Sequence, residues 1–156
     1  MTTPTVEERI ATIRDFVPRL RDLIDGLNDE QVTTQYNAPE WTIAQNVHHL
    51  ADAHMHAFLR CKQILTQDEA QLFGWNPSEY AKEPDAMDAN VELSLKILEG
   101  IHARWTTMFE NVTDWDKSGW HTGANKHISL DTHLSTYSRH GDAHYRQIQE
   151  VLEKMP

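Results

Sequence analysis

The sequence predicts a single all-α domain, residues 1–156, folded as a four-helix bundle. Two observations lead to this prediction. Four segments place apolar residues at alternating steps of three and four positions, which is the spacing of one face of an α-helix. Three of these segments begin with a side chain of the kind that caps helix N-termini. Because each helix has one apolar stripe to bury, packing the four stripes together is the most economical arrangement.

The first expected helix covers residues 6–27. Thr5 and Glu8 form the T-x-x-E pattern of a capping box at its start. Pro18 lies in the middle of the segment. Because proline has no N–H and its ring clashes with the preceding turn, we expect a kink or a local break at this position.

The second expected helix covers residues 42–65, with Thr42 and Gln45 as its capping box. Its apolar stripe includes His54, so this histidine is expected in the interior of the bundle. His49 lies immediately beside the stripe. The helix therefore brings polar rings to the edge of the core.

The last two expected helices cover residues 88–109 and 130–152, and Ser129 caps the second of them. The inward face of helix 130–152 carries His140 and His144 among apolar residues. An unpaired buried polar group costs about 1–3 kcal/mol. We therefore expect both rings to have polar partners or a bound ion.

The connections between the helices are unequal in length. Residues 28–41 join the first two helices, and residues 66–87 form a long crossover between the second and the third. Long links in a compact domain usually span its length or take part in function. Residues 111–129 contain turn-forming glycine and asparagine, and we expect a short hairpin there, with Trp120 and Ile128 in its strands.

The composition excludes several classes of partner. The formal net charge is −10, and such a chain is repelled by nucleic acid and by anionic membrane surfaces. No apolar run approaches the ~20 residues of a membrane span. The lone cysteine, Cys61, fits a reducing compartment, and the first residues do not resemble an export signal. We therefore expect a cytoplasmic protein whose partner is a small molecule.

Two of the ten histidines have the spacing of metal ligands. His140 and His144 are four positions apart on one helix, so their imidazoles lie on the same face, one turn apart. Neutral imidazole binds zinc, nickel, copper and iron. The adjacent His48 and His49 offer a third nitrogen from another helix. Three protein nitrogens with an open fourth position are typical of a catalytic zinc site.

The other polar residues near these positions have alternative roles. His54 is expected to be a hydrogen-bonded core residue or a pocket wall. His48 points about 100° away from His49 around the helix and is expected to face solvent. Asp52 either orients the ring of His49 through its second nitrogen or is a solvated charge, and Tyr137 is another candidate for an outer role. The remaining histidines are expected on the surface or in loops: His56, His102, His121, His127 and His133. Among these, His133 has the strongest case for an inward role, because it lies seven residues before His140 on the same face.

Three runs of the sequence resemble a known family. They are WTIAQNVHHLADAH at 41–54, IHARWT at 101–106 and YSRHGDAH at 137–144. All three resemble the DinB/YfiT-like superfamily, and more closely its YfiT-type branch. The similarity follows the chain in order over nearly its whole length.

The resemblance implies a four-helix bundle of up-down-down-up topology that is often dimeric. It also implies a metal ion held by His49, His140 and His144, which selects His49 over His48 as helical phase does. The sequence departs from the family in one place. Close relatives often carry additional histidines between the last two ligands, whereas residues 141–143 here are Gly, Asp and Ala.

The function that the resemblance implies is metal-dependent chemistry on a small molecule. Members are described as metal-dependent hydrolases, and several relatives are thiol S-transferases that use bacillithiol, mycothiol or glutathione. Zinc or nickel is the expected ion, and a metal-bound water or thiolate would be the nucleophile. The alternative is a non-catalytic or stress-associated bundle in which a metal ion only links two helices.

Two further features bear on the expected site. Cys61 lies twelve residues beyond His49 and points away from it around the helix, so we expect it to pack rather than to act as a nucleophile. The aromatic segment 73–80, with Trp75 and Tyr80, either lines the substrate pocket or covers the end of the bundle or a dimer interface.

Overall fold

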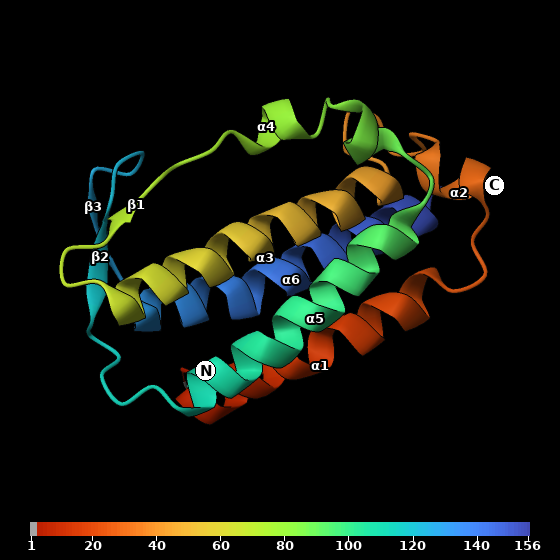
Figure 1. Cartoon of the computed structure of the whole chain (residues 1–156). Helices are drawn as coiled ribbons and strands as arrows, with labels where there is room; N and C mark the ends of the chain where they lie inside the picture. Colours follow the sequence, from red (N-terminus) through yellow and green to blue (C-terminus); the bar gives the residue numbers. More distant parts are fainter. Residues whose placement is uncertain (1–2) are drawn as a thin grey trace.

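The computed structural model describes residues 3–156 and contains four long helices that pack as a bundle (Figure 1). These are α1 (Val6–Ile24), α3 (Ile43–Thr66), α5 (Val91–Glu110) and α6 (Leu130–Leu152). The predicted fold class is confirmed, and the expected bounds of these helices agree with the observed ones to within three residues. The shorter elements are α2 (Asp29–Thr33), β1 (Gln71–Leu72), α4 (Pro77–Tyr80), the 3₁₀ helix η1 (Pro84–Met87), β2 (Ser118–His121) and β3 (Lys126–Ser129).

The bundle has the up-down-down-up topology. Helices α1 and α6 run in one direction along the bundle, and α3 and α5 run in the other (Figure 1). Each of α1 and α3 packs against both α5 and α6, so α1 and α3 occupy opposite corners. Because α3 and α5 are parallel neighbours, the chain must travel back along the bundle between them. The crossover that contains β1, α4 and η1 does this along one side of α3, as the sequence predicts.

The helices begin where the capping patterns place them. Thr5 and Thr42 each form a reciprocal capping box with the residue three positions on, and the Ser129 hydroxyl accepts from the third backbone N–H of α6. A further box, Asn28 with Gln31, starts the short helix α2 inside the link that sequence analysis left without structure.

Of the two outcomes expected at Pro18, a kink or a local break, the break does not occur, because α1 is one continuous helix from Val6 to Ile24. Pro18 lies on the exposed side of α1. The carbonyl of Arg14, four residues earlier, loses its helical hydrogen bond but can accept from water there. The helix ends three residues earlier than expected, where Gly26 takes a φ of 74°.

A small sheet closes one end of the bundle. Strands β2 and β3 form the predicted hairpin, with Trp120 paired opposite His127 and Ile128 opposite Gly119. Asn125 in its turn has a φ of 52°, which asparagine tolerates better than most residues. Strand β1 of the crossover adds to the hairpin in parallel, so the crossover and the hairpin are joined.

The core consists of two apolar clusters with a polar layer between them. On α3, the residues up to Ala51 belong to one cluster and those from Ala57 onward to the other. On α5, the division falls between Leu98 and Trp105. His49 lies just outside this gap on α3. Four other histidines of the bundle interior lie on the helices in the gap: His54, His102, His140 and His144.

Candidate metal centre

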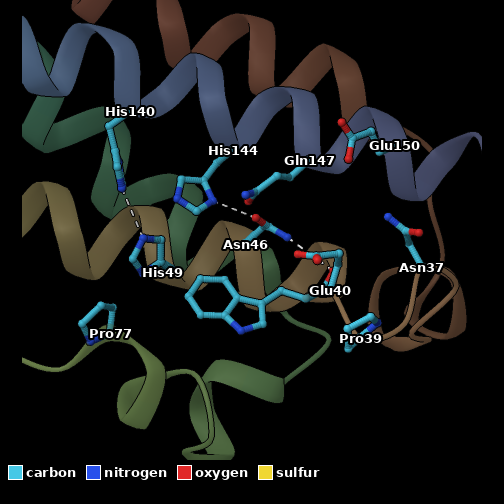
Figure 2. Close-up of a pocket in the computed structure, with 11 residues that line it drawn as sticks. Asn37, Pro39, Glu40, Asn46, His49, Pro77, His140, His144, Gln147 and Glu150 are labelled. Atoms are coloured by element: carbon cyan, nitrogen blue, oxygen red, sulfur yellow. Dashed lines mark hydrogen bonds between the residues drawn. The ribbon is translucent and has the colours of Figure 1, made fainter.

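Three histidines from two antiparallel helices meet at the polar layer. His49 comes from α3, and His140 and His144 come from neighbouring turns of α6. One nitrogen from each ring lies within 4.8 Å of the others, and the Nε2 atoms of His49 and His140 are 3.3 Å apart (Figure 2). The structure thus brings together the three residues that the sequence predicts as ligands.

The ring of His144 is oriented by Asn46. The Nδ1 of His144 lies 2.8 Å from the side-chain oxygen of Asn46, and the Asn46 amide nitrogen donates to the carbonyl of Thr42 at 2.9 Å. The oxygen of Asn46 can only accept, so the proton of His144 is on Nδ1 and the lone pair is on Nε2. Sequence analysis missed Asn46, although its place one turn before His49 puts it on the same face of α3.

The ring of His140 is oriented by a chain of hydrogen bonds through the interior. Its Nδ1 lies 3.1 Å from Nε2 of His54, whose Nδ1 lies 2.7 Å from Nε2 of His102. The Nδ1 of His102 lies 2.6 Å from the carbonyl oxygen of Ile13. Because that carbonyl can only accept, each neutral ring in the chain carries its proton on Nδ1. The lone pair on Nε2 of His140 is therefore left facing His49 and His144, the other two candidate ligands.

The ring of His49 is enclosed by aromatic neighbours, and its one polar side-chain contact among residues 3–156 is with Nε2 of His140. Its centroid lies 4.9 Å from that of Trp41 and 5.7 Å from that of Trp75. Its Nδ1 is buried and has no hydrogen-bond partner among the described residues. Asp52 therefore does not orient this ring in the structure. The pKa of Asp52 is raised, first by burial and then by the nearby Asp85.

The electrostatics of the three rings favour metal binding. Burial lowers the pKa of His49 and of His140 to about 4, and that of His144 to about 3. The neighbouring imidazoles lower the values of His49 and His144 further. All three rings are therefore neutral at pH 7, which is the form that binds a metal. Three converging imidazoles without a carboxylate fit zinc or nickel and do not fit calcium or magnesium.

His48 is buried, which corrects the expectation that it faces solvent. It is 8% exposed, and its two nitrogens lie 2.7 Å from the hydroxyl of Ser94 and 2.9 Å from the carbonyl oxygen of Asp88. His48 and His49 do point in different directions around α3, but α3 has neighbours on more than one side. A rotation away from α6 turns His48 towards α5 and the end of the crossover.

Two more histidines expected on the surface are buried. His102 is part of the interior chain, and His133 is 3% exposed and lies 3.1 Å from the carbonyl oxygen of Ser129. His102 was not identified from the sequence, because it is one position from the predicted stripe of its helix. The position of His133, seven residues before His140, did place it on the same face of α6. His127, in contrast, is exposed as expected.

The candidate substrate-binding residues have different surroundings. Trp75 stacks on His56 at 4.8 Å and lines a cavity beside His49. Tyr80 is 42% exposed and contacts Trp75, outside the cavity walls. His54 is fully buried and acts through His140, as a hydrogen-bonded core residue. Tyr137 lines the same cavity as Trp75, and burial raises its pKa.

Two cavities of about 410 Å³ each open onto the histidines, and both include His49 and His140 in their walls. The first also contains His144 and, further out, Glu40 and Glu150 (Figure 2). We call the other one the second cavity. Its walls come from α3, α6, the crossover and the hairpin. A ligand could thus approach the centre from either cavity.

The fold and the site define a four-helix-bundle protein with an accessible centre of three histidines. The model of the DinB superfamily matches residues 14–148, and the chain belongs to this superfamily. Two curated relatives are provisionally named metal-dependent hydrolases. The one from Geobacillus thermodenitrificans is 42% identical over 151 residues, which cover 96% of this chain and 85% of the relative. YfiT from Bacillus subtilis is 28% identical over 148 residues, which cover 94% and 83%.

Two solved structures share the fold. The structure of YfiT from Bacillus subtilis, described as an unusual four-helix bundle, superposes with a TM-score of 0.90 at 27% identity and covers 99% of this chain and 91% of that one. A mycothiol-dependent maleylpyruvate isomerase gives a TM-score of 0.74 at 14% identity, with 95% of this chain and 63% of the isomerase covered. The second likeness concerns the fold alone.

Proposed function

We propose that this protein is an enzyme that acts on a small molecule and depends on a zinc or nickel ion held by His49, His140 and His144. The observation that carries the proposal is the convergence of three neutral imidazoles within 4.8 Å, in the walls of two cavities. The provisional names of the relatives support metal-dependent hydrolysis. Transfer of a thiol such as bacillithiol, mycothiol or glutathione is the other reaction that we propose to test.

Both reactions make the same demand on the site. A bound transition metal lowers the pKa of a water or thiol, so that a nucleophile forms at neutral pH. The chain's own residues position the three histidine rings and exclude water from them. Asn46 and His54 fix the tautomers of His144 and His140, and Trp41 and Trp75 enclose the ring of His49.

The rival function is a metal ion that only links α3 to α6. A structural zinc site is closed by four protein ligands, whereas a catalytic site keeps an open position. Within residues 3–156, the cluster contains three candidate ligands, and two cavities reach it. These features favour the catalytic site.

The test combines metal analysis with an activity screen. We expect one zinc or nickel ion per chain, and turnover in a panel of esters, amides and thiols paired with electrophiles. His49→Ala should lose both the metal and the activity, while His127→Ala, on the exposed hairpin, should keep both. Activity that persists in metal-free His49→Ala would establish the linking role instead.

We also propose that the protein is a cytoplasmic homodimer. No helix in residues 3–156 is long and apolar enough to cross a membrane. Sedimentation equilibrium at micromolar concentration tests the dimer, and a single monomeric species would contradict it.

A further inference from the structure

The second cavity contains a buried cation without an anionic partner. Arg60 of α3 is 8% exposed, and its guanidinium donates to the backbone carbonyl of Phe73 in the crossover. No carboxylate among residues 3–156 forms an ion pair with it. Arg9, whose side chain is 13% exposed, instead pairs with Asp131 at 2.8 Å. A comparable arginine in the same protein thus has the partner that Arg60 lacks.

Burial of an unpaired charge destabilises the folded state, so the buried position of Arg60 needs an explanation. Removing an ion from water without a counter-charge disfavours the folded state. One carbonyl satisfies only one of the five N–H donors of a guanidinium. The hydroxyl of Tyr137 lies close enough to the guanidinium that the cation lowers its pKa, against the larger effect of burial. The guanidinium of Arg60 on α3 and the hydroxyl of Tyr137 on α6 are therefore two possible donors in the lining of the same cavity.

The charge of the second cavity is opposite to that of the protein. The chain has 24 acidic residues, yet no carboxylate is among the residues that line this cavity, while Arg60 is. The first cavity has acidic walls, since Glu40 and Glu150 line it and no arginine or lysine does. An anionic ligand is therefore favoured in the second cavity and disfavoured in the first.

Two segments that line the second cavity are in close contact, and the cavity reaches the histidine centre. A Cβ on Gly74 of the crossover would lie 3.3 Å from the Cα of Gly123 in the hairpin turn, so the two segments are in close contact at the cavity. His49 and His140 line the same space as Arg60. One small molecule can therefore contact the histidine centre and the guanidinium together.

We propose that the second cavity binds an oxyanion of the substrate, a carboxylate or a phosphate, through Arg60 and Tyr137, while the reacting atom lies at the histidine centre. This assignment rests on the proposed function and specifies its substrate class. The guanidinium and the phenol donate to the oxyanion, and charge-assisted bonds of this kind are the strong ones. Arg60 and Tyr137 are thus specificity-determining residues.

The experiment uses the protein loaded with Co²⁺, whose thiolate charge-transfer band reports a thiol bound at the centre. Mercaptoacetate, 3-mercaptopropionate and 4-mercaptobutyrate present a carboxylate at increasing distance from the sulfur, and 2-mercaptoethanol is the neutral reference. We expect at least one carboxylate thiol to bind about tenfold more tightly than the reference. The ratio of the two affinities should fall to about one in Arg60→Gln and partly recover in Arg60→Lys.

Matched variants and a second ligand complete the test. Arg104→Gln removes an arginine that packs over Phe58 and is not among the cavity residues, so the ratio should stay at the wild-type value. Inorganic phosphate should weaken binding of the carboxylate thiol if phosphate is accepted as well, and leave it unchanged if the site takes carboxylates alone. Tyr137→Phe, which keeps the ring, should lower the ratio several-fold and serves as the test if Arg60→Gln does not fold.

The outcomes separate this proposal from the proposed function. Equal affinities for neutral and carboxylate thiols in the wild type would overturn the oxyanion site alone. Loss of dimer in Arg60→Gln would overturn it too, because the guanidinium would then pair with a second copy. If 2-mercaptoethanol gives no charge-transfer band, the thiol reaction fails. The oxyanion site then depends on whether acetate or phosphate raises the Tm of the wild type but not of Arg60→Gln.

Discussion

Two groups of histidines lie side by side in the bundle, and they use their ring nitrogens differently. The cavity histidines are His49, His140 and His144, and the interior histidines are His54 and His102. His140 and His144 each use Nδ1 for a hydrogen bond and direct Nε2 to the centre. His54 and His102 use both nitrogens within the protein. The difference shows that a histidine becomes a candidate ligand here when the fold leaves one of its nitrogens facing a cavity, and His49, whose Nδ1 has no partner among the described residues, meets the same condition.

The two groups are also connected. The interior rings join the carbonyl of Ile13 on α1 to His140 on α6, through His54 on α3 and His102 on α5. All four long helices therefore contribute to the orientation of one candidate ligand. Substitutions and pH changes that affect mainly the cavity histidines or mainly the interior histidines test whether the interior rings orient His140.

The largest expected effect is acid unfolding of the metal-free protein. Burial lowers the pKa of His49, His102 and His140 to about 4 in the folded state, against about 6.5 in the unfolded chain. Below pH 6.5 the unfolded state binds protons that the folded state does not, so stability falls as the pH falls towards 4. Each such ring lowers the free energy of unfolding by about 2 kcal/mol at pH 5. Three rings together remove a large part of the ~5–15 kcal/mol that is typical of a folded domain.

Urea unfolding from pH 7.5 to pH 4.5, with and without zinc, measures this loss. Bound metal should protect the protein at the upper end of the range, because it binds only the folded, neutral site. A free energy of unfolding that does not change between pH 6.5 and 5 would contradict the burial of these rings.

The next effect concerns the interior chain. His54→Leu should lower metal affinity about 10- to 100-fold, as loss of a hydrogen-bond partner of a ligand typically does. Leucine packs in place of the ring, so the fold should remain. His102→Leu breaks the chain one bond further away and should have a smaller effect. Competition with a zinc chelator gives the affinities.

The tautomer of His140 provides a readout that a purely structural role would not change. Nitrogen-15 spectra of the metal-free protein should show its proton on Nδ1 in the wild type and a mixture of tautomers in His54→Leu. A pure Nδ1–H tautomer in both proteins would rule out the proposed orientation by His54.

A smaller effect is expected for His48→Ala. The ring bonds Ser94 and the carbonyl of Asp88 in the interface with α5, so its loss should destabilise the protein by about 1–3 kcal/mol. Metal stoichiometry should not change, because His48 is not in the cluster. Thermal unfolding and elemental analysis of one sample give both values, and loss of the ion would contradict the assignment of His49.

The smallest effect is expected for Asp52→Ala. Asp52 makes no hydrogen bond to the buried Nδ1 of His49, so the affinity for metal should change by less than about twofold. Asp52→Asn is the matched variant that keeps the shape. A tenfold loss in both variants, by chelator competition, would show that the carboxylate reaches the ring in solution.

Local signals in the sequence determined the helices and the ligand spacing. Thr5, Thr42 and Ser129 begin their helices as the capping rules predict, because a cap involves only neighbours along the chain. The i, i+4 spacing of His140 and His144 follows from helix geometry in the same way. Helical phase and the family resemblance both selected His49 over His48, whereas the topology came from the resemblance alone.

The tertiary structure decided which polar residues are buried and what they bind. His48 and His102 were expected on the surface, because periodicity identifies one apolar face of a helix, whereas α3 and α5 each pack against more than one neighbour. The bond between His54 and His140 joins residues 86 positions apart. The lack of an ion pair between Arg60 and any described carboxylate likewise results from the way the helices pack. Such contacts depend on how distant segments meet, and no local pattern in the sequence records that.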